Sequence, residues 1–293
     1  MEVVSRLTPS VVTVRTGEGL GSGVVYRPDI VLTNQHVVTD AREVTVDYAD
    51  GRSSPGVVLA TDQVTDLAVI RTARDGLPVP EYRTELPQPG EPVLAIGSPL
   101  GFEGTVTSGI VSGLNRQIPG SAAQARALVD LIQTDAAISP GNSGGALLDA
   151  AGRVVGINEA YIPPSAGAVS LGFAIPAATA VDIADQLLVD GTATHPYLGV
   201  TLARLTPEIR RSLGVSAESG VLVVDVAAGG PAAAAGVRRG DVIVALGDRP
   251  VGSVEGLIGA LRETEPEQRS SIGVLRDGRR IDSPITIGAQ PTS

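Results

Sequence analysis

The stretch GNSGGALLDAAGRVVGI, Gly141–Ile157, decides the fold class of this chain. Ser143 lies among three glycines, and the apolar residues Ala146–Leu148 follow closely. The turn sequence Asp149–Gly152 separates them from a second apolar run, Val154–Ile157. Two short apolar runs joined by a Gly-containing turn predict a β-hairpin after Ser143, not a helix.

Short apolar runs between Gly, Pro and Asp turns continue from Pro9 to about Ile175, and this spacing is typical of β-barrels and sandwiches. Apolar residues make up 43% of the 293 positions, which is enough for more than one core. Aromatic residues make up only 2%, so Val, Ile, Leu and Ala must fill the cores, and this favours strands. We therefore predict a mostly β protein that begins with two small barrels. The predicted strands are Val11–Val14, Gly23–Tyr26, Ile30–Thr33, Val44–Asp47, Leu67–Ile70, Val93–Gly97, Val106–Ser112, Ala146–Leu148, Val154–Ile157 and Phe173–Ile175.

The pattern changes after these strands. Pro176–Asp190 is predicted to be a helix that ends at Gly191, and the small, polar stretch 191–196 to be a linker. We therefore predict a first module at 1–190 and a second at 197–290. The second module is expected to contain strands at Val221–Val226, Val242–Ala245, Ser271–Leu275 and Pro284–Ile287, with helices at Pro231–Ala235 and Val254–Arg262.

Composition excludes several classes of function. The net charge of −10 without a basic patch argues against a nucleic-acid partner, because phosphate binding needs clustered Lys and Arg. The absence of cysteine excludes disulfides, thiol catalysis and zinc–thiolate sites. No apolar run approaches the ~20 residues of a membrane span, and Met1-Glu2 does not begin a secretory signal. We expect no transmembrane segment, and either a cytoplasmic location or an export segment outside this chain.

Two residues could act as base and nucleophile. His36, one of only two histidines, follows the predicted strand Ile30–Thr33, and its ordinary pKa of about 6.5 suits proton transfer near neutral pH. The glycines around Ser143 allow the amides of Gly141 and Ser143 to converge on one point, as an oxyanion requires. Each residue also has a structural interpretation, as a hydrogen-bonded histidine or as part of a Gly-rich turn.

Asp66 is the candidate third member of this group. It opens the apolar run Leu67–Ile70, so its carboxylate is expected to be partly buried and to need a partner. A turn-capping role is the alternative, and Asp62 is the weaker candidate. The order His36, Asp66, Ser143 matches one known order of the hydrolase triad.

With these residues in place, the chain resembles the HtrA family of chymotrypsin-fold serine proteases with C-terminal PDZ domains. The resemblance extends in family order over nearly the whole chain. Its motifs are Thr33–Val37, Thr65–Ile70, Gly97–Pro99, Thr105–Ser112, Thr134–Ile138, Gly141–Gly145 and Gly172–Pro176.

The resemblance implies a double β-barrel followed by one PDZ domain. It implies a serine endopeptidase that degrades or processes unfolded or mislocalised proteins, with no metal and no cofactor. His36, Asp66 and Ser143 would be the triad, and Gly141 and Ser143 the oxyanion hole. It allows a homotrimer, and it favours a periplasmic, cell-envelope or extracellular location. A peptide-binding chaperone or scaffold with an idle protease site is the alternative.

The resemblance also indicates how the substrate is selected. Trypsin-like relatives that prefer basic side chains carry an acid six residues before the nucleophile, where this chain has Ala137. We therefore expect a small or medium apolar residue before the scissile bond. The expected pocket walls are Ala137, Ile138, Leu171, Gly172, Phe173 and Ala174.

Two further features follow from the family. Asn142 replaces the Asp of digestive relatives, so zymogen-type activation is not expected; the loops Asn115–Ala127 and Tyr161–Val169 would instead order the oxyanion hole. In the second module, Tyr197, Leu198, Gly199 and Val200 resemble the PDZ loop that binds the carboxylate of a C-terminal peptide, which would add as a strand beside Val254–Arg262. An ordinary strand entry with a Gly bulge is the alternative for this loop.

Two rival motifs are rejected. Gly141–Gly145 also fits the G-x-S-x-G elbow of α/β-hydrolases, with Asp185 and His195 as later partners, but that elbow needs a helix after the serine. The glycines of 17–23 miss the spacing of a phosphate loop and precede a predicted strand, so we expect a hairpin connection there.

Overall fold

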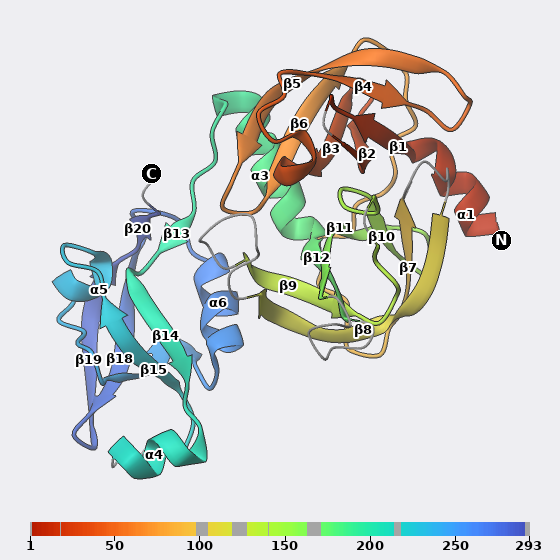
Figure 1. The fold of residues 1–293 in the computed structure, drawn as a ribbon. Coiled ribbons are helices and arrows are strands. Elements are labelled where there is room, and N and C mark those ends of the chain that lie inside the picture. The colour runs from red at the N-terminus through yellow and green to blue at the C-terminus, as the bar shows by residue number, and fades with distance from the viewer. Residues whose placement is uncertain are drawn as a thin grey trace. The chain divides into compact units, whose positions relative to one another are not determined.

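The computed structural model describes residues 2–17, 19–97, 105–118, 128–139, 141–162, 171–213 and 218–290. The chain forms two compact units, Met1–Ala193 and Thr194–Ser293 (Figure 1). Strands predominate in both, which confirms the predicted fold class. Across the described ranges, no helix combines the length and apolar character that a membrane crossing requires.

The first unit contains two closed barrels, each formed by six strands of the described chain. The first barrel has the order β1-β2-β3-β6-β5-β4, and the second β10-β11-β12-β9-β8-β7. The strands of the first are β1 Val11–Arg15, β2 Leu20–Arg27, β3 Ile30–Asn34, β4 Glu43–Asp47, β5 Ser53–Asp62 and β6 Leu67–Thr72. Those of the second are β7 Pro92–Gly97, β8 Thr105–Ile118, β9 Leu128–Thr134, β10 Ala146–Asp149, β11 Val154–Ile162 and β12 Leu171–Pro176.

Strand alternation divides the apolar residues among three cores. In β3, Val31 packs inside the first barrel, whereas Ile30 and Leu32 belong to a second cluster shared by both barrels. In β10, Leu147 packs inside the second barrel and Leu148 belongs to the shared cluster. Because successive side chains of a strand point to opposite faces, one short run contributes to two cores. This explains why the runs of this unit are almost continuously apolar.

Helices close and connect the barrels. The predicted helix is α3, Ala177–Asp190, and it ends at Gly191 in the left-handed conformation (φ +72°). Its apolar face, which includes Ile183 and Leu187, packs in the shared cluster. Short helices at the start of the chain and after β3 had no clear sequence signal: α1 Glu2–Leu7, η1 Thr8–Ser10 and α2 Gln35–Val38.

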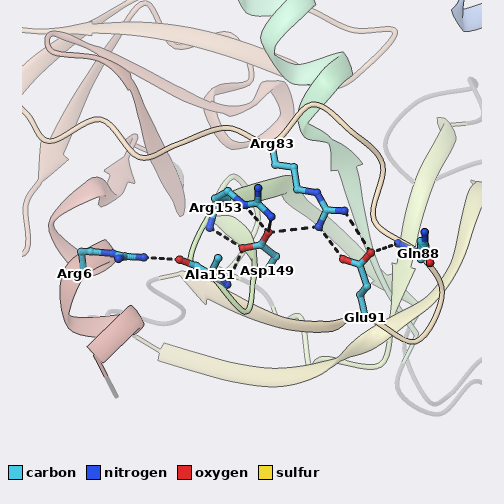
Figure 2. Close-up of polar contacts among 7 residues, drawn as sticks. All are labelled: Arg6, Arg83, Gln88, Glu91, Asp149, Ala151 and Arg153. Carbon is cyan, nitrogen blue, oxygen red and sulfur yellow. Dashed lines mark hydrogen bonds and ion pairs between the residues drawn. The ribbon is translucent and has the colours of Figure 1, made fainter.

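A buried ion-pair cluster fixes the turn between β10 and β11 (Figure 2). Asp149, 4% exposed, accepts hydrogen bonds from the amides of Ala151 and Arg153 at 3.0 and 2.9 Å and pairs with the guanidinium of Arg153 at 2.8 Å. Arg83 lies between Asp149 and Glu91. Burial opposes the charge of Asp149, but the donors of Arg153 and Ala151 outweigh it and lower the pKa of Asp149.

We expect Asp149→Ala to lower the free energy of unfolding of the first unit by about 2 kcal/mol, because the amides of Ala151 and Arg153 and the guanidinium of Arg153 lose their acceptor, whereas Arg83 keeps Glu91. Urea unfolding followed by circular dichroism measures this. The folded-state pKa of Asp149 is depressed, so its contribution is complete above the unfolded pKa of about 4 and is lost as the pH falls through the folded value. The difference between the two proteins should therefore shrink at acid pH.

The exposed pair of Asp50 and Arg74 provides the control, because solvent screens this ion pair and Asp50→Ala should lower the free energy of unfolding much less than Asp149→Ala does. Equal effects of the two substitutions would contradict the assignment of Asp149 as the buried centre of the cluster.

The second unit is built around a six-stranded sheet of the order β14-β15-β16-β18-β19, with β17 paired to β16. A two-stranded sheet, β13-β20, lies beside it, and the helix α6 carries Leu257 and Ala260 into the core. The strands are β13 Pro196–Tyr197, β14 Val200–Arg204, β15 Val221–Val226, β16 Val242–Leu246, β17 Arg249–Pro250, β18 Arg269–Arg276, β19 Arg279–Thr286 and β20 Gly288–Ala289. The helices are α4 Pro207–Leu213, α5 Pro231–Ala234 and α6 Val254–Arg262.

Candidate active site

Asp66 organises the turn that carries His36. Its Oδ2 lies 2.5 Å from His36 Nδ1, and its Oδ1 accepts a hydrogen bond from the backbone amide of His36 at 2.9 Å. The carbonyl of Asp66 accepts from Gln35 N at 3.0 Å and from Asn34 Nδ2 at 2.9 Å. Asp66 adopts a left-handed backbone conformation, φ +57°, which Asp tolerates better than most residues. The two predicted residues therefore form one hydrogen-bonded unit.

The protonation of His36 follows from this contact. A carboxylate only accepts, so Nδ1 carries the hydrogen that it donates to Asp66, and Nε2 keeps its lone pair. Burial alone would lower the pKa of His36, but the hydrogen bond and charge of Asp66, together with the charge that Glu159 carries when it is ionised, raise it. The imidazolium is thus stabilised where a general base must accept a proton.

The loop that carries Ser143 is held by hydrogen bonds from both barrels. From the first barrel, Ser22 Oγ donates to Gly141 O at 2.6 Å and Ser22 N to Ser143 O at 2.8 Å. From β11, Asn158 O accepts from Gly144 N at 2.8 Å. Gly144 has a φ of +82°, and a Cβ there would lie 2.1 Å from Ser22 O. The close approach of the two barrels therefore requires glycine at this position.

The two amides predicted to hold an oxyanion belong to this loop. Gly141 has a φ of +97°, which is accessible to glycine. Within the described residues, the amides of Gly141 and Ser143 donate to no other backbone group, whereas those of Asn142, Gly144 and Gly145 all do. The loop thus leaves the two predicted donors available for a ligand.

The hydroxyl of Ser143 has a different partner from the one expected for a triad. Its Oγ donates to the backbone carbonyl of Glu159 at 2.6 Å, and no hydrogen bond between Ser143 and His36 occurs among the described residues. In the described part of the chain, the hydrogen bond between His36 and Asp66 is therefore formed, whereas the one expected between Ser143 and His36 is not.

Glu159 is a site residue that the sequence reasoning missed. It is 4% exposed, and its carboxyl group lies in a cluster with the imidazole of His36 and the carboxyl group of Asp66. One nitrogen or oxygen atom from each of the three side chains lies within 4.8 Å of the other two. Burial, the charge of Asp66 and a hydrogen bond with Asp66 raise the pKa of Glu159 to about 8, although His36 opposes this shift. The only available signal was an acid within the otherwise uncharged run Val154–Ile162.

These three residues are the one group in the described part of the chain with spacing suitable for a metal ion. However, His36 Nδ1 and Asp66 Oδ2 are 2.5 Å apart, which is a hydrogen-bond distance and leaves no room for an ion between them. The cluster is therefore interpreted as part of an acid–base site.

The predicted pocket residues lie around the end of β12. Ile138 is buried and contacts Gly172, where a Cβ would be 3.0 Å from Ile138 Cδ1. Ala137 is exposed, and its carbonyl accepts from Thr107 Oγ1 at 2.8 Å. Leu171 is half-buried, Phe173 packs in the cluster shared by the barrels, and Ala174 packs inside the second barrel.

The weaker candidates lie elsewhere. Asp62 accepts hydrogen bonds from Thr65 and thus caps a turn. Asp185 on α3 bonds Tyr26 and Arg27, and His195 belongs to the second unit. The strand β10, not a helix, follows Ser143, which confirms the rejection of the esterase elbow.

Two other expectations concern loops. The glycine-rich stretch of 17–23 joins the antiparallel strands β1 and β2, as expected of a hairpin connection, although β2 already begins at Leu20. Of the loops expected to order the oxyanion hole, Asn115–Ala127 and Tyr161–Val169, residues 119–127 and 163–169 lie outside the described residues.

In the second unit, the predicted carboxylate-binding residues lie between β13 and β14. Leu198 O and Gly199 O accept from Ala232 N and Ala227 N at 2.9 and 2.8 Å, which anchors the loop. Gly199 has a φ of +76°. The following strand β14 is at the edge of its sheet, and α6 contacts both β13 and β14. An edge strand beside a helix is the arrangement to which an extended peptide can add.

Comparison with known proteins agrees with this architecture. A model of the trypsin-like peptidase domain matches residues 21–157, and a model of the PDZ domain matches residues 196–287. The curated relatives include a probable periplasmic serine endoprotease DegP-like of Pseudomonas putida (strain GB-1), 38% identical over 94% of this chain and 57% of its own length. They also include a putative serine protease HhoB of Synechocystis, 45% identical over 78% of this chain and 57% of its own length. The chain thus spans little more than half the length of these relatives.

Solved structures match over almost the entire chain. An HtrA-type protease, AlgW, with a tripeptide has a TM-score of 0.81 and 37% identity, and the match covers 99% of this chain and 97% of that one. A serine endoprotease from Yersinia pestis has a TM-score of 0.69 and 33% identity over 99% of this chain and 97% of that one.

Proposed function

Because the chain belongs to the HtrA family of trypsin-like serine proteases with a PDZ domain, we propose that it is a serine endopeptidase acting on unfolded or mislocalised proteins. The observation that carries this proposal is the His36–Asp66 pair beside a glycine-bounded Ser143. We assign the protease domain to residues 1–190, the linker to 191–196 and the PDZ domain to 197–290.

In the proposed reaction, the Ser143 hydroxyl first leaves the carbonyl of Glu159 and turns toward His36 Nε2. His36 then takes its proton as Oγ attacks the peptide carbonyl, and Asp66 stabilises the resulting imidazolium. The amides of Gly141 and Ser143 hold the oxyanion, and His36 returns the proton to the leaving amine. Water repeats the sequence on the acyl-enzyme and releases the second product.

Fluorophosphonate labelling tests this assignment, because the reagent modifies an activated serine. We expect labelling of wild type and of Ser139→Ala, which alters an exposed serine near Ser143, but not of Ser143→Ala. Wild type and Ser139→Ala should also degrade fluorescent casein, whereas Ser143→Ala should not. The scaffold alternative predicts no labelling of any of the three proteins, even with an activating peptide.

We further propose that Ile138 and Gly172 form part of a specificity pocket that accepts a small or medium apolar side chain, because Ala137 supplies no negative charge. Peptide-library profiling decides this: predominance of Arg or Lys before the scissile bond would contradict it.

The PDZ domain is proposed to bind the C-terminus of a peptide. The amides of Leu198 to Val200 would hold the carboxylate while the peptide pairs with the free edge of β14. The AlgW structures with peptides support the binding of peptides by this type of chain.

We expect a fluorescent peptide with a free C-terminal carboxylate to bind at least about tenfold more tightly than its C-terminally amidated counterpart, because the amidated form lacks the charge held by the amides. Fluorescence anisotropy measures this difference. Equal affinities would show that the loop Tyr197–Val200 does not recognise a carboxylate.

A further inference from the structure

Glu159 occupies a β-bulge that places its side chain at the triad. On β11, Asn158 pairs with Ala174 and Ala160 pairs with the adjacent Phe173, so Glu159 is the extra residue between them. Bulges redirect one side chain and are frequent beside active sites. Here the carbonyl of Glu159 accepts from Ser143, while its carboxyl group lies beside His36 and Asp66.

The two carboxyl groups are not equivalent. Asp66 accepts hydrogen bonds from two N–H groups of His36, one on the backbone and one on the ring. Glu159 Oε2 is buried and has no hydrogen-bond donor from the described residues. One carboxylate oxygen of each residue lies within 4.8 Å of the other, and two carboxyl groups this close can share a hydrogen bond only if one of them carries a proton. Glu159 is the group that the surroundings leave protonated.

We propose that Glu159 is a positioning residue of the triad, a buried carboxylic acid that donates a hydrogen bond to Asp66 and sets the negative charge facing His36. The proposal rests on the proposed peptidase function. The site then consists of four interacting groups, namely Ser143, His36, Asp66 and Glu159. Only one of its two carboxyl groups is ionised near neutral pH.

The charges around Glu159 are limited to this cluster. Among the described groups, His36 and Asp66 are the ones that act on it. The neighbouring strands β3 and β12 carry no ionisable side chain. Asp149 at the far end of β10 is paired with Arg153, and Asp185 on α3 is paired with Arg27. The titration of Glu159 is therefore coupled to that of His36 through Asp66.

The sign of this coupling follows from the charges. The pKa of Glu159 is about 8, so above that pH the carboxyl loses its proton and a second negative charge faces His36. That charge stabilises the imidazolium formed as Ser143 attacks, so kcat should continue to rise between pH 7 and pH 9. Glu159→Gln keeps a hydrogen-bond donor of similar shape but cannot ionise.

Kinetics on a fluorogenic peptide in buffer with EDTA provide the first test. We expect the ratio of kcat at pH 9 to kcat at pH 7 to be about fivefold lower in Glu159→Gln than in wild type, which corresponds to a typical coupling between two sites. Glu159→Asp, which keeps an ionisable group, should restore part of the rise. Glu81→Gln, which changes an exposed glutamate away from the site, should match wild type.

NMR of the Ser143→Ala protein provides the second test, and it requires no peptidase activity. The chain has only two histidines, so the ring signals of His36 and His195 can be followed separately. We expect His36 to report two inflections, its own and one near pH 8, and the second to vanish when Glu159→Gln is added. The ring signals of His195 should be the same in both proteins at every pH.

Failure of the proposed peptidase function and failure of the proposed role of Glu159 can be told apart. Absence of fluorophosphonate labelling in wild type refutes the peptidase function, whereas a single His36 inflection in Ser143→Ala refutes the role of Glu159. A kcat ratio in Glu159→Gln equal to that of wild type also refutes it.

Discussion

Replacing Ser143 by alanine is expected to lower kcat for peptide hydrolysis by about 10⁶-fold, the loss typical when the nucleophile of a serine protease triad is removed. The hydroxyl at this position is held by a hydrogen bond to the carbonyl of Glu159 in the second barrel, and the backbone carbonyl of Ser143 accepts a hydrogen bond from Ser22 in the first barrel. Removal of the hydroxyl leaves the proposed oxyanion donors, the amides of Gly141 and residue 143, in place, so a residual rate above that of water should persist. Quantitative hydrolysis of a fluorogenic peptide measures the loss.

The circular dichroism spectrum and Tm of Ser143→Ala should match those of wild type, because the substitution removes one hydroxyl and its single hydrogen bond to Glu159. Ser139→Ala serves as the kinetic control. If Ser143→Ala retained more than about 1% of wild-type kcat, another group would be the nucleophile.

Asp66→Asn is expected to lower kcat by about 10⁴-fold while the protein remains folded. A carboxylate can accept at both oxygens, and Asp66 uses one for the amide and the other for the ring of His36. Asparagine has one acceptor, and its NH₂ group must face one of these two donors or force the ring into the other tautomer. A ring with its proton on Nε2 cannot accept the proton of Ser143.

Asp62→Asn is the matched control for Asp66→Asn. Asp62 is also buried and lies four residues earlier, but its carboxylate bonds Thr65 instead of His36. We expect its kcat to equal that of wild type. A loss below about tenfold in Asp66→Asn would indicate that Asp66 does not fix the tautomer, and equal losses in both variants would indicate a general effect of the turn.

Much of this architecture was predictable from local patterns. The helix of α3 had a proline before its start, an apolar face and a terminal glycine, and α6 was predicted with the bounds that the structure shows. By contrast, β5 contains Pro55 and has a mixed burial pattern, so its ten residues gave no strand signal. The helix α2, which carries His36, is a single turn and is too short for a periodicity to appear.

The sequence by itself determined the fold class, the order of the candidate triad residues and the glycines around Ser143, because strand alternation, turns and backbone freedom are local properties. Only the tertiary structure decided which atoms meet. The partner of Ser143, the two hydrogen bonds of Asp66 to His36, and the need for glycine at Gly144 all depend on contacts between segments distant in the chain. Glu159 shows the difference most clearly: in the sequence it is one acid in an apolar strand, and a bulge and the packing of the barrels place its carboxyl beside Asp66. Burial and the neighbouring charge then determine its protonation, and neither can be read from its position in the sequence.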